Sequence, residues 1–281
     1  ISILLLLVGA FSFSQDISWS FQAELNNQGK FVQNAIYSPY RQWTALSLGA
    51  DISILDELGH EIYSTKRNNT YGDICFSPDE KYLLIRNWRA EGDIAFLDLN
   101  TLLVKNVLQK EGFLDAHRMA FAGDIHHLLF FSPKGMTLFY MDDKADLTFL
   151  QKFHTEAKND IREFSVSENG QWLAVSETGT IHLSDDNKYI GFGITLYERK
   201  GDKYVQKDEY NTSTTKHFVQ FVTGTEKLMI SVEKEYGDKE NALIFFDCSK
   251  GKFNQIDRLE LEREVEYAGF SKDGKWLSLI H

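Results

Sequence analysis

The chain has 281 residues, of which 43% are hydrophobic and 25% charged, and its formal net charge is −11 at pH 7. This length is enough for one large core or several small ones. An acidic surface repels phosphate backbones, which argues against a nucleic-acid partner. The only cysteines, Cys75 and Cys248, are far apart and do not make a disulfide framework, so we expect two separate free thiols.

The first 14 residues are predicted to be part of a signal peptide. Residues 1–13 carry no charge and are apolar apart from two serines, as in the apolar core of a secretory signal. The stretch is too short to span a bilayer comfortably, and Ser12 and Ser14 suit cleavage before Gln15. We expect a bacterial chain exported to the periplasm or outside, with a mature domain over 15–281 and no membrane span. The alternative is a buried hydrophobic strand.

A sequence motif then recurs six times along the chain. In each copy we call the aromatic or aliphatic residue that ends a short apolar run the anchor. The anchors are Tyr37, Phe76, Phe121, Val166, Phe221 and Phe270. A turn follows the anchor, as in Ser-Pro-Asp-Glu at 77–80 and Ser-Lys-Asp-Gly at 271–274. Two apolar runs joined by such a turn favour a β-hairpin.

A further apolar run in each of the first five copies ends in an acid, and a fourth run follows. The closing acids are Asp56, Asp98, Asp142, Glu198 and Asp247. Four short β-rich strands in units of this length are typical of propeller blades. We therefore predict an all-β fold: a β-propeller of four-stranded antiparallel blades, five complete plus a partial sixth.

The last copy stops inside its second strand, so we expect the propeller to be incomplete at its C-terminal end and to belong to a larger protein, with a further domain after His281. Residues 17–25 alternate apolar and polar side chains. We expect this segment to form an outer strand that closes the ring onto the last blade.

Over roughly residues 17–281 the chain resembles WD-repeat-like β-propellers of bacteria. The resemblance rests on the Phe-Ser-Pro-Asp turn, seen at 76–79, and on the hydrophobic–acid pair that closes the third strand. The Trp-Asp dipeptide of that family is absent, and no Gly-His pair precedes a first strand. The resemblance implies a propeller scaffold without the family's buried Asp–His network. Some similar exported propellers are joined to a caspase-like or other peptidase domain.

We find no catalytic signature. Metal-binding, nucleophile-elbow and phosphate-loop motifs are absent, and the neighbouring His126 and His127 would point to opposite faces of a strand. The innermost strands carry one polar residue per blade, mixed in sign: Asp73, Arg118, Glu163 and Glu266. This pattern suits a water-filled channel more than a metal cage. We expect no catalytic residue, cofactor or metal, and keep a lactonase-like propeller hydrolase as the alternative.

Two insertions between second and third strands, 178–191 in blade four and 233–241 in blade five, are candidate binding loops on one face. The alternative is neutral drift. The candidate binding residues are Glu177, Asp185, Asp186, Tyr189, Glu233, Glu235, Tyr236, Asp238 and Glu240. Seven acids beside two tyrosines favour a basic or amphipathic protein or peptide partner. We therefore predict an exported, non-catalytic interaction platform.

Overall fold

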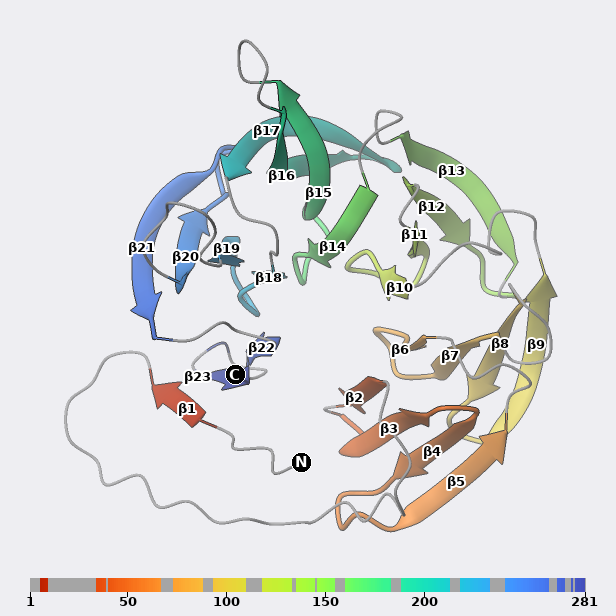
Figure 1. Cartoon of the computed structure of the whole chain (residues 1–281). Helices are drawn as coiled ribbons and strands as arrows, with labels where there is room; N and C mark the ends of the chain where they lie inside the picture. The colour runs from red at the N-terminus through yellow and green to blue at the C-terminus, as the bar shows by residue number, and fades with distance from the viewer. Residues whose placement is uncertain are drawn as a thin grey trace.

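The computed structural model describes residues 6–9, 34–38, 40–66, 73–87, 93–109, 118–132, 135–144, 146–154, 160–182, 188–212, 218–232, 241–262, 267–270, 274 and 276–280. These residues form strands and turns and contain no helix. Five four-stranded antiparallel sheets, each made of four consecutive strands, follow one another around a ring (Figure 1). The predicted all-β propeller fold is confirmed.

Each complete blade runs from an innermost strand outward. The first blade holds β2 (Asn34–Ser38), β3 (Trp43–Leu48), β4 (Asp51–Leu55) and β5 (Glu61–Lys66). The second holds β6 (Ile74–Phe76), β7 (Tyr82–Arg86), β8 (Asp93–Asp98) and β9 (Leu103–Gln109). The third holds β10 (Arg118–Phe121), β11 (His127–Ser132), β12 (Gly135–Met141) and β13 (Leu147–His154).

The fourth blade holds β14 (Asp160–Val166), β15 (Trp172–His182), β16 (Lys188–Lys200) and β17 (Lys203–Thr212). The fifth holds β18 (Val219–Phe221), β19 (Lys227–Val232), β20 (Asn241–Asp247) and β21 (Asn254–Leu261). Strands β2, β6, β10, β14 and β18 lie nearest the centre of the ring, and the fourth strand of each blade lies at its rim (Figure 1).

A sixth sheet has three strands, in the order β1-β23-β22. Here β22 (Tyr267–Phe270) and β23 (Trp276–Ile280) pair as the hairpin that the last copy predicts. The third strand is β1 (Leu6–Gly9), antiparallel to β23, so the structure pairs a segment that we expected to lie outside the fold. The edge of β23 offers unpaired backbone groups that an extended apolar segment can satisfy. Removal of residues 1–14 stays a prediction, and 17–25 lies outside the described residues.

The side chain of a serine closes the turn after the anchor. In the second blade the Ser77 hydroxyl donates to Asp79 Oδ1 at 2.7 Å and accepts from the Tyr82 amide at 3.0 Å. In the fourth blade Ser167 makes the same two bonds, to Asn169 Oδ1 at 2.8 Å and from the Trp172 amide at 2.9 Å. This is why Ser and then Asp or Asn recur in the repeat.

The acid that closes the third strand caps the next turn. Asp56 Oδ1 accepts from the backbone amides of Leu58 and His60, at 2.9 and 2.8 Å. The same carboxylate-to-backbone capping occurs at Asp98, Asp142 and Asp247. Glu198, which is longer, instead pairs with Lys200 at 2.7 Å and Lys207 at 3.2 Å. The hydrophobic–acid pair is therefore a turn-forming feature of the repeat.

A β-bulge recurs at the same register in the outer strand of every complete blade. In the second blade Phe96 faces Asn106 and the next residue, Leu97, faces Val104, which leaves one residue of β9 unpaired. The residues so displaced are Ile62, Lys105, Leu150, Lys207 and Ile256. Bulges strengthen twist and make a rim strand a poorer template for pairing with another chain.

The hydrophobic core lies between the blades. Leu84, Phe96 and Phe130 belong to one buried cluster that joins the second and third sheets. Another joins the fourth and fifth sheets around Trp172 and Phe246. The same arrangement links the first to the second blade, the third to the fourth, and the fifth to the three-stranded sheet. Among the residues that the structure describes, no separate layer covers a sheet, so each blade depends on its neighbours.

At the interface of the third and fourth blades the turns after the anchors touch backbone to backbone. Gly170 has φ +68°, and a Cβ on it would lie 2.1 Å from the Ala122 carbonyl oxygen. Gly201 has a similar φ of +62° but open space around it. A substitution at Gly201 therefore measures the cost of backbone strain alone, whereas the same substitution at Gly170 adds the cost of a steric clash.

We predict that Gly201→Ala lowers the free energy of unfolding by about 1–2 kcal/mol, the cost of a left-handed alanine. Gly170→Ala adds a clash that must push two blades apart, so we expect a loss of about 3 kcal/mol or more. Urea unfolding of both variants measures the difference. Equal losses would mean that the close approach of these turns does not matter.

Candidate interaction site

The hairpin of β15 and β16 is longer than its counterparts in the other blades. These strands have 11 and 13 residues, against 5–7 in the second and third strands of the other complete blades. β14 pairs only as far as Thr178 and β17 only as far as Phe192. Beyond these residues, as far as the described part of the chain shows, the two strands pair only with each other, out to His182 opposite Lys188. The arrow of β15 extends past its neighbours in Figure 1.

The predicted loop over 178–191 is therefore largely strand. The residues on both sides of its tip include β-branched and aromatic types that favour extended backbone, such as Thr180, Ile181 and Ile190. An insertion in a hairpin can continue the pairing of its two strands, and length alone does not distinguish that outcome from a loop.

The predicted binding residues divide into two groups. Glu177 is half-buried at the base of the extension, opposite Gly193, and the backbone of Tyr189 lies in β16 opposite Ile181. The others lie outside the described residues: Asp185, Asp186, Glu233, Glu235, Tyr236, Asp238 and Glu240. The predicted acidic patch thus stays a prediction.

The two-stranded ribbon of β15 and β16 rises at the end of the sheet where the innermost strands begin, because Glu177 is opposite Ile161 of β14. Three residues before each of the first four anchors, at this same end of the strands, polar side chains form an arc across four blades. Asn34 Nδ2 donates to Asp73 Oδ1 at 2.5 Å, and the Met119 amide donates to Asp73 Oδ2 at 2.9 Å. Arg118 of the third blade forms an ion pair with Glu163 of the fourth.

The structure thus brings Asp73, Arg118 and Glu163 together as one group of mixed charge, and Glu266 lies outside the described residues. Burial raises the pKa of Asp73 and of Glu163, although the charge of Arg118 acts in the opposite direction on both. Burial and the charge of Asp73 raise the pKa of the Cys75 thiol to about 12. That thiol is protonated at neutral pH and is a poor nucleophile.

The adjacent histidines make separate contacts. His127 is buried, with Nδ1 2.9 Å from Asp124 Oδ1, and Arg199 of the fourth blade reaches the same carboxylate at 2.8 Å. His126 instead stacks on Tyr140, with 5.4 Å between ring centroids. In the described part of the chain no three metal-ligating side chains converge. Cys75 and Cys248 are free thiols, as the sequence predicted.

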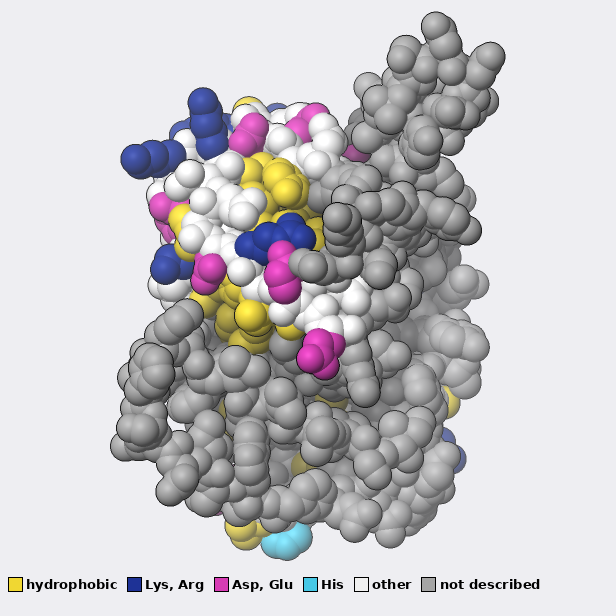
Figure 2. Space-filling model, turned by 60° about the vertical axis from the view of Figure 1, so that its left-hand side comes forward, with side chains coloured by type: hydrophobic (Ala, Val, Ile, Leu, Met, Phe, Trp, Pro, Cys, Tyr) yellow, Lys and Arg dark blue, Asp and Glu magenta, His cyan; other side chains and the backbone are white. Residues whose placement is uncertain are grey.

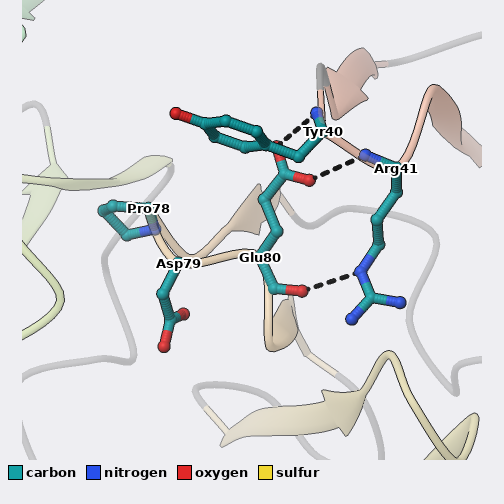
Figure 3. A pocket seen from close by; sticks show the side chains of 5 residues that line it. All are labelled: Tyr40, Arg41, Pro78, Asp79 and Glu80. Atoms are coloured by element: carbon teal, nitrogen blue, oxygen red, sulfur yellow. Dashed lines mark hydrogen bonds between the residues drawn. The ribbon is translucent and has the colours of Figure 1, made fainter.

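On the opposite face, a pocket of about 470 Å³ lies between the turns of the first two blades (Figure 3). It is lined by Tyr40 and Arg41 from the first turn and by Pro78, Asp79 and Glu80 from the second. Sequence reasoning missed these residues. The signal was that Glu80 occupies the turn position where two other copies have glycine, Gly170 and Gly274.

The rim of the fifth blade is less distinctive. Figure 2 looks onto the side that carries β20 and β21, and hydrophobic side chains there lie among charges of both signs. On β21, Ile256 and Leu259 are exposed, and Arg258 pairs with Glu260. Scattered exposed aliphatic residues of this kind are normal on a protein surface.

No family model matches the chain, and no curated protein matches it. Among solved structures it is similar to the WD40 domain of Pan2 from Neurospora crassa, with a TM-score of 0.61, 10% identity, and coverage of 89% of this chain and 75% of that one. Hydrazine synthase from Kuenenia stuttgartiensis matches with a TM-score of 0.60 and 11% identity, over 94% of this chain and 77% of that one. The Dos1 propeller matches with a TM-score of 0.57 and 12% identity, over 91% of this chain and 80% of that one. At these identities the similarity establishes the β-propeller fold alone.

We predict a pH-dependent loss of stability for Arg118→Met. Without the guanidinium, the pKa values of Glu163 and Asp73 rise further above their ordinary range. Between the unfolded and the raised folded pKa the native state holds more protons than the unfolded state, so stability falls as pH rises through that window. We therefore expect a larger loss at about pH 7 than at about pH 4.

Urea unfolding at both pH values measures this effect. In the Glu163→Gln background the extra loss at the higher pH should shrink, because one of the two uncompensated carboxylates is gone. The matched control is Arg258→Met, whose ion pair with Glu260 is exposed, and for which a change within about 0.5 kcal/mol is expected at either pH. A pH-independent effect of Arg118→Met would mean that the arc is not electrostatically coupled.

Proposed function

We propose that the chain is a non-catalytic interaction platform. Its binding face carries the β15–β16 ribbon and the arc of polar side chains formed by Asn34, Asp73, Arg118 and Glu163. The observation that carries this proposal is the ribbon beyond Thr178 and Phe192, which has no third strand among the described residues. An isolated two-stranded ribbon is marginally stable in water. Contact with a partner would stabilise it, through its strand edges or its side chains.

The chemistry of that partner follows from charge. The β15–β16 hairpin and the connection between β19 and β20 in blade five carry seven acids in sequence, near Tyr189 and Tyr236, and the whole chain is acidic. A basic or amphipathic protein or peptide is attracted to such a surface, and charge complementarity mainly raises the association rate. Tyrosines supply contact area at low cost in side-chain entropy. We further propose that the platform works outside the cytoplasm, as the N-terminal sequence suggests, within a larger protein.

A propeller hydrolase is the weaker alternative. The carboxylates of Asp73 and Glu163 accept hydrogen bonds or ion pairs from neighbouring blades, so both already act as links between those blades. A role as the propeller part of an exported peptidase is compatible with the platform and adds a domain to it.

We predict that the ribbon can be removed without loss of the fold. The variant deletes Gly179–Gly191 and joins Thr178 to Phe192, which are paired residues, through an Asn-Gly turn suited to a two-residue hairpin. Because β14 and β17 pair only up to these residues, we expect the free energy of unfolding to change by about 0.5 kcal/mol or less. Partner capture should be lost.

Photo-crosslinking in producing cells tests capture directly. A benzophenone amino acid replaces Tyr189 on the ribbon or, as control, Leu103, which is 63% exposed on the rim of the second blade. The proposal expects a crosslinked product from position 189 that disappears when Asp185 and Asp186 are changed to Lys. Equal crosslinking from both positions, or insensitivity to the charge reversal, would contradict it.

A further inference from the structure

We propose a second binding site, on the face opposite the ribbon: the pocket between the first two blades takes a cationic side chain, lysine or arginine, from a peptide or protein partner. The pocket lies at the turns that follow Tyr37 and Phe76, and these turns are at the other end of the innermost strands from Asn34 and Asp73. It is therefore separate from the proposed ribbon site.

The pocket lies where Arg41 and Glu80 occupy the turn position, four residues after the anchor, at which two other copies of the repeat have glycine. At later interfaces the corresponding turns are in contact: a Cβ on Gly123 would lie 2.1 Å from the Gly170 nitrogen, and one on Gly274 would lie 2.7 Å from the Thr223 carbonyl oxygen. At the first interface the position of Gly170 is taken by Arg41 and Glu80, whose side chains span the gap. These side chains bond the two turns to each other, and a pocket of about 470 Å³ lies beside them.

Glu80 holds this geometry despite an unfavourable backbone. Its φ is +51°, in the left-handed region that disfavours residues with a Cβ. Glu80 is buried, with only 5% of the residue exposed. Its carboxylate accepts hydrogen bonds from the Ser38 hydroxyl, from the Tyr40 amide at 3.2 Å and from the Arg41 amide at 3.1 Å. These charge-assisted bonds offset the strain and tie the first turn to the second blade.

The hydrogen bonds of Glu80 also fix the backbone that carries the aromatic ring of Tyr40. The Tyr40 amide is bound to Glu80, yet the residue is 76% exposed. In Figure 3 its ring extends over Glu80 toward Pro78, another conformationally restricted residue. An exposed tyrosine on a rigid turn loses little entropy when a ligand covers it, which is the property of an interface anchor.

The electrostatics of the lining favour a cation. Each guanidinium nitrogen of Arg41 donates one hydrogen bond: Nε to the Glu80 carbonyl at 2.9 Å, Nη1 to the Leu99 carbonyl at 3.1 Å and Nη2 to Asn100 Oδ1 at 2.6 Å. Its guanidinium lies 4.9 Å from the centre of the Trp43 ring and, in Figure 3, is turned away from Tyr40 and Pro78. The arginine thus stabilises the blade interface.

Asp79 supplies a negative charge in the lining of the pocket. Although partial burial acts the other way, hydrogen bonds from Ser77 and Lys81 hold the pKa of Asp79 below its ordinary value. Its ion pair with Lys81, at 3.1 Å, is on the surface, where such pairs contribute little. An incoming ammonium or guanidinium can therefore replace Lys81 beside Asp79 while its stem and charge lie against the Tyr40 ring.

The test uses the full chain labelled with ¹⁵N and three capped tripeptides, Gly-Lys-Gly, Gly-norleucine-Gly and Gly-Glu-Gly, titrated to about 20 mM, a range that covers the affinity of a single side chain. The lysine peptide should shift the amide signals of Tyr40, Arg41 and Glu80, and the arginine analogue should do the same. Norleucine has the same apolar stem without the charge and should bind at least about threefold more weakly.

Two variants with matched controls locate the site. Tyr40→Ala and Asp79→Asn should each weaken lysine-peptide binding by about threefold or more, the scale of an exposed cation–π contact. Phe149→Ala and Asp257→Asn, an exposed aromatic and an exposed acid on rim strands, should leave it unchanged. The variant without the ribbon should bind the lysine peptide as the parent does, which separates this site from the proposed function. Undetectable lysine binding, equal binding of norleucine or glutamate, or insensitivity to Tyr40→Ala would overturn the proposal.

Discussion

The structure depends on burial between sheets. Every complete blade is four strands wide from centre to rim, and the described residues that cover its hydrophobic side chains belong to the neighbouring blades. Polar groups also cross these interfaces in hydrogen-bonded pairs: Gln151 of β13 and the backbone of Tyr204 of β17 exchange two hydrogen bonds, at 2.9 and 2.8 Å. Unpaired, each would cost a share of the burial energy. Sequence change is therefore least costly at the ends of the strands, where the ribbon and the pocket lie.

The fold was predictable from sequence because its determinants are local and repeated. An anchor, a Ser-x-Asp turn and a closing acid each perform their task within a few residues, as the capping by Asp56 and the turn of Ser77 show. Repetition lets a weak local signal accumulate over the copies. The recurrent bulge was not predictable, because it depends on the register between two strands, and the displaced residues share no type: Ile62, Lys105, Leu150, Lys207 and Ile256.

The candidate sites were harder to predict because each depends on a pairing between distant residues. Asp73, Arg118 and Glu163 could be recognised as one polar residue per blade, but not the hydrogen bonds that join them around the channel. The ribbon was read as a loop because length alone says nothing about pairing. Glu80 was overlooked because an acid in a turn is ordinary in sequence. Only its left-handed φ and its contacts across 39 to 42 positions show what it does.

Rigidity distinguishes the two proposed surfaces. The pocket is formed by turns whose backbone amides are bound across a blade interface, so its shape exists before a ligand arrives. The ribbon has a partner strand on one side only in the described part of the chain, and a ligand that orders it must supply the free energy of ordering. A preformed pocket favours selection of a small chemical group, whereas an adaptable ribbon favours a larger and more varied surface. Because the surfaces lie at opposite ends of packed strands and share no residue, their binding energies should add when both are occupied.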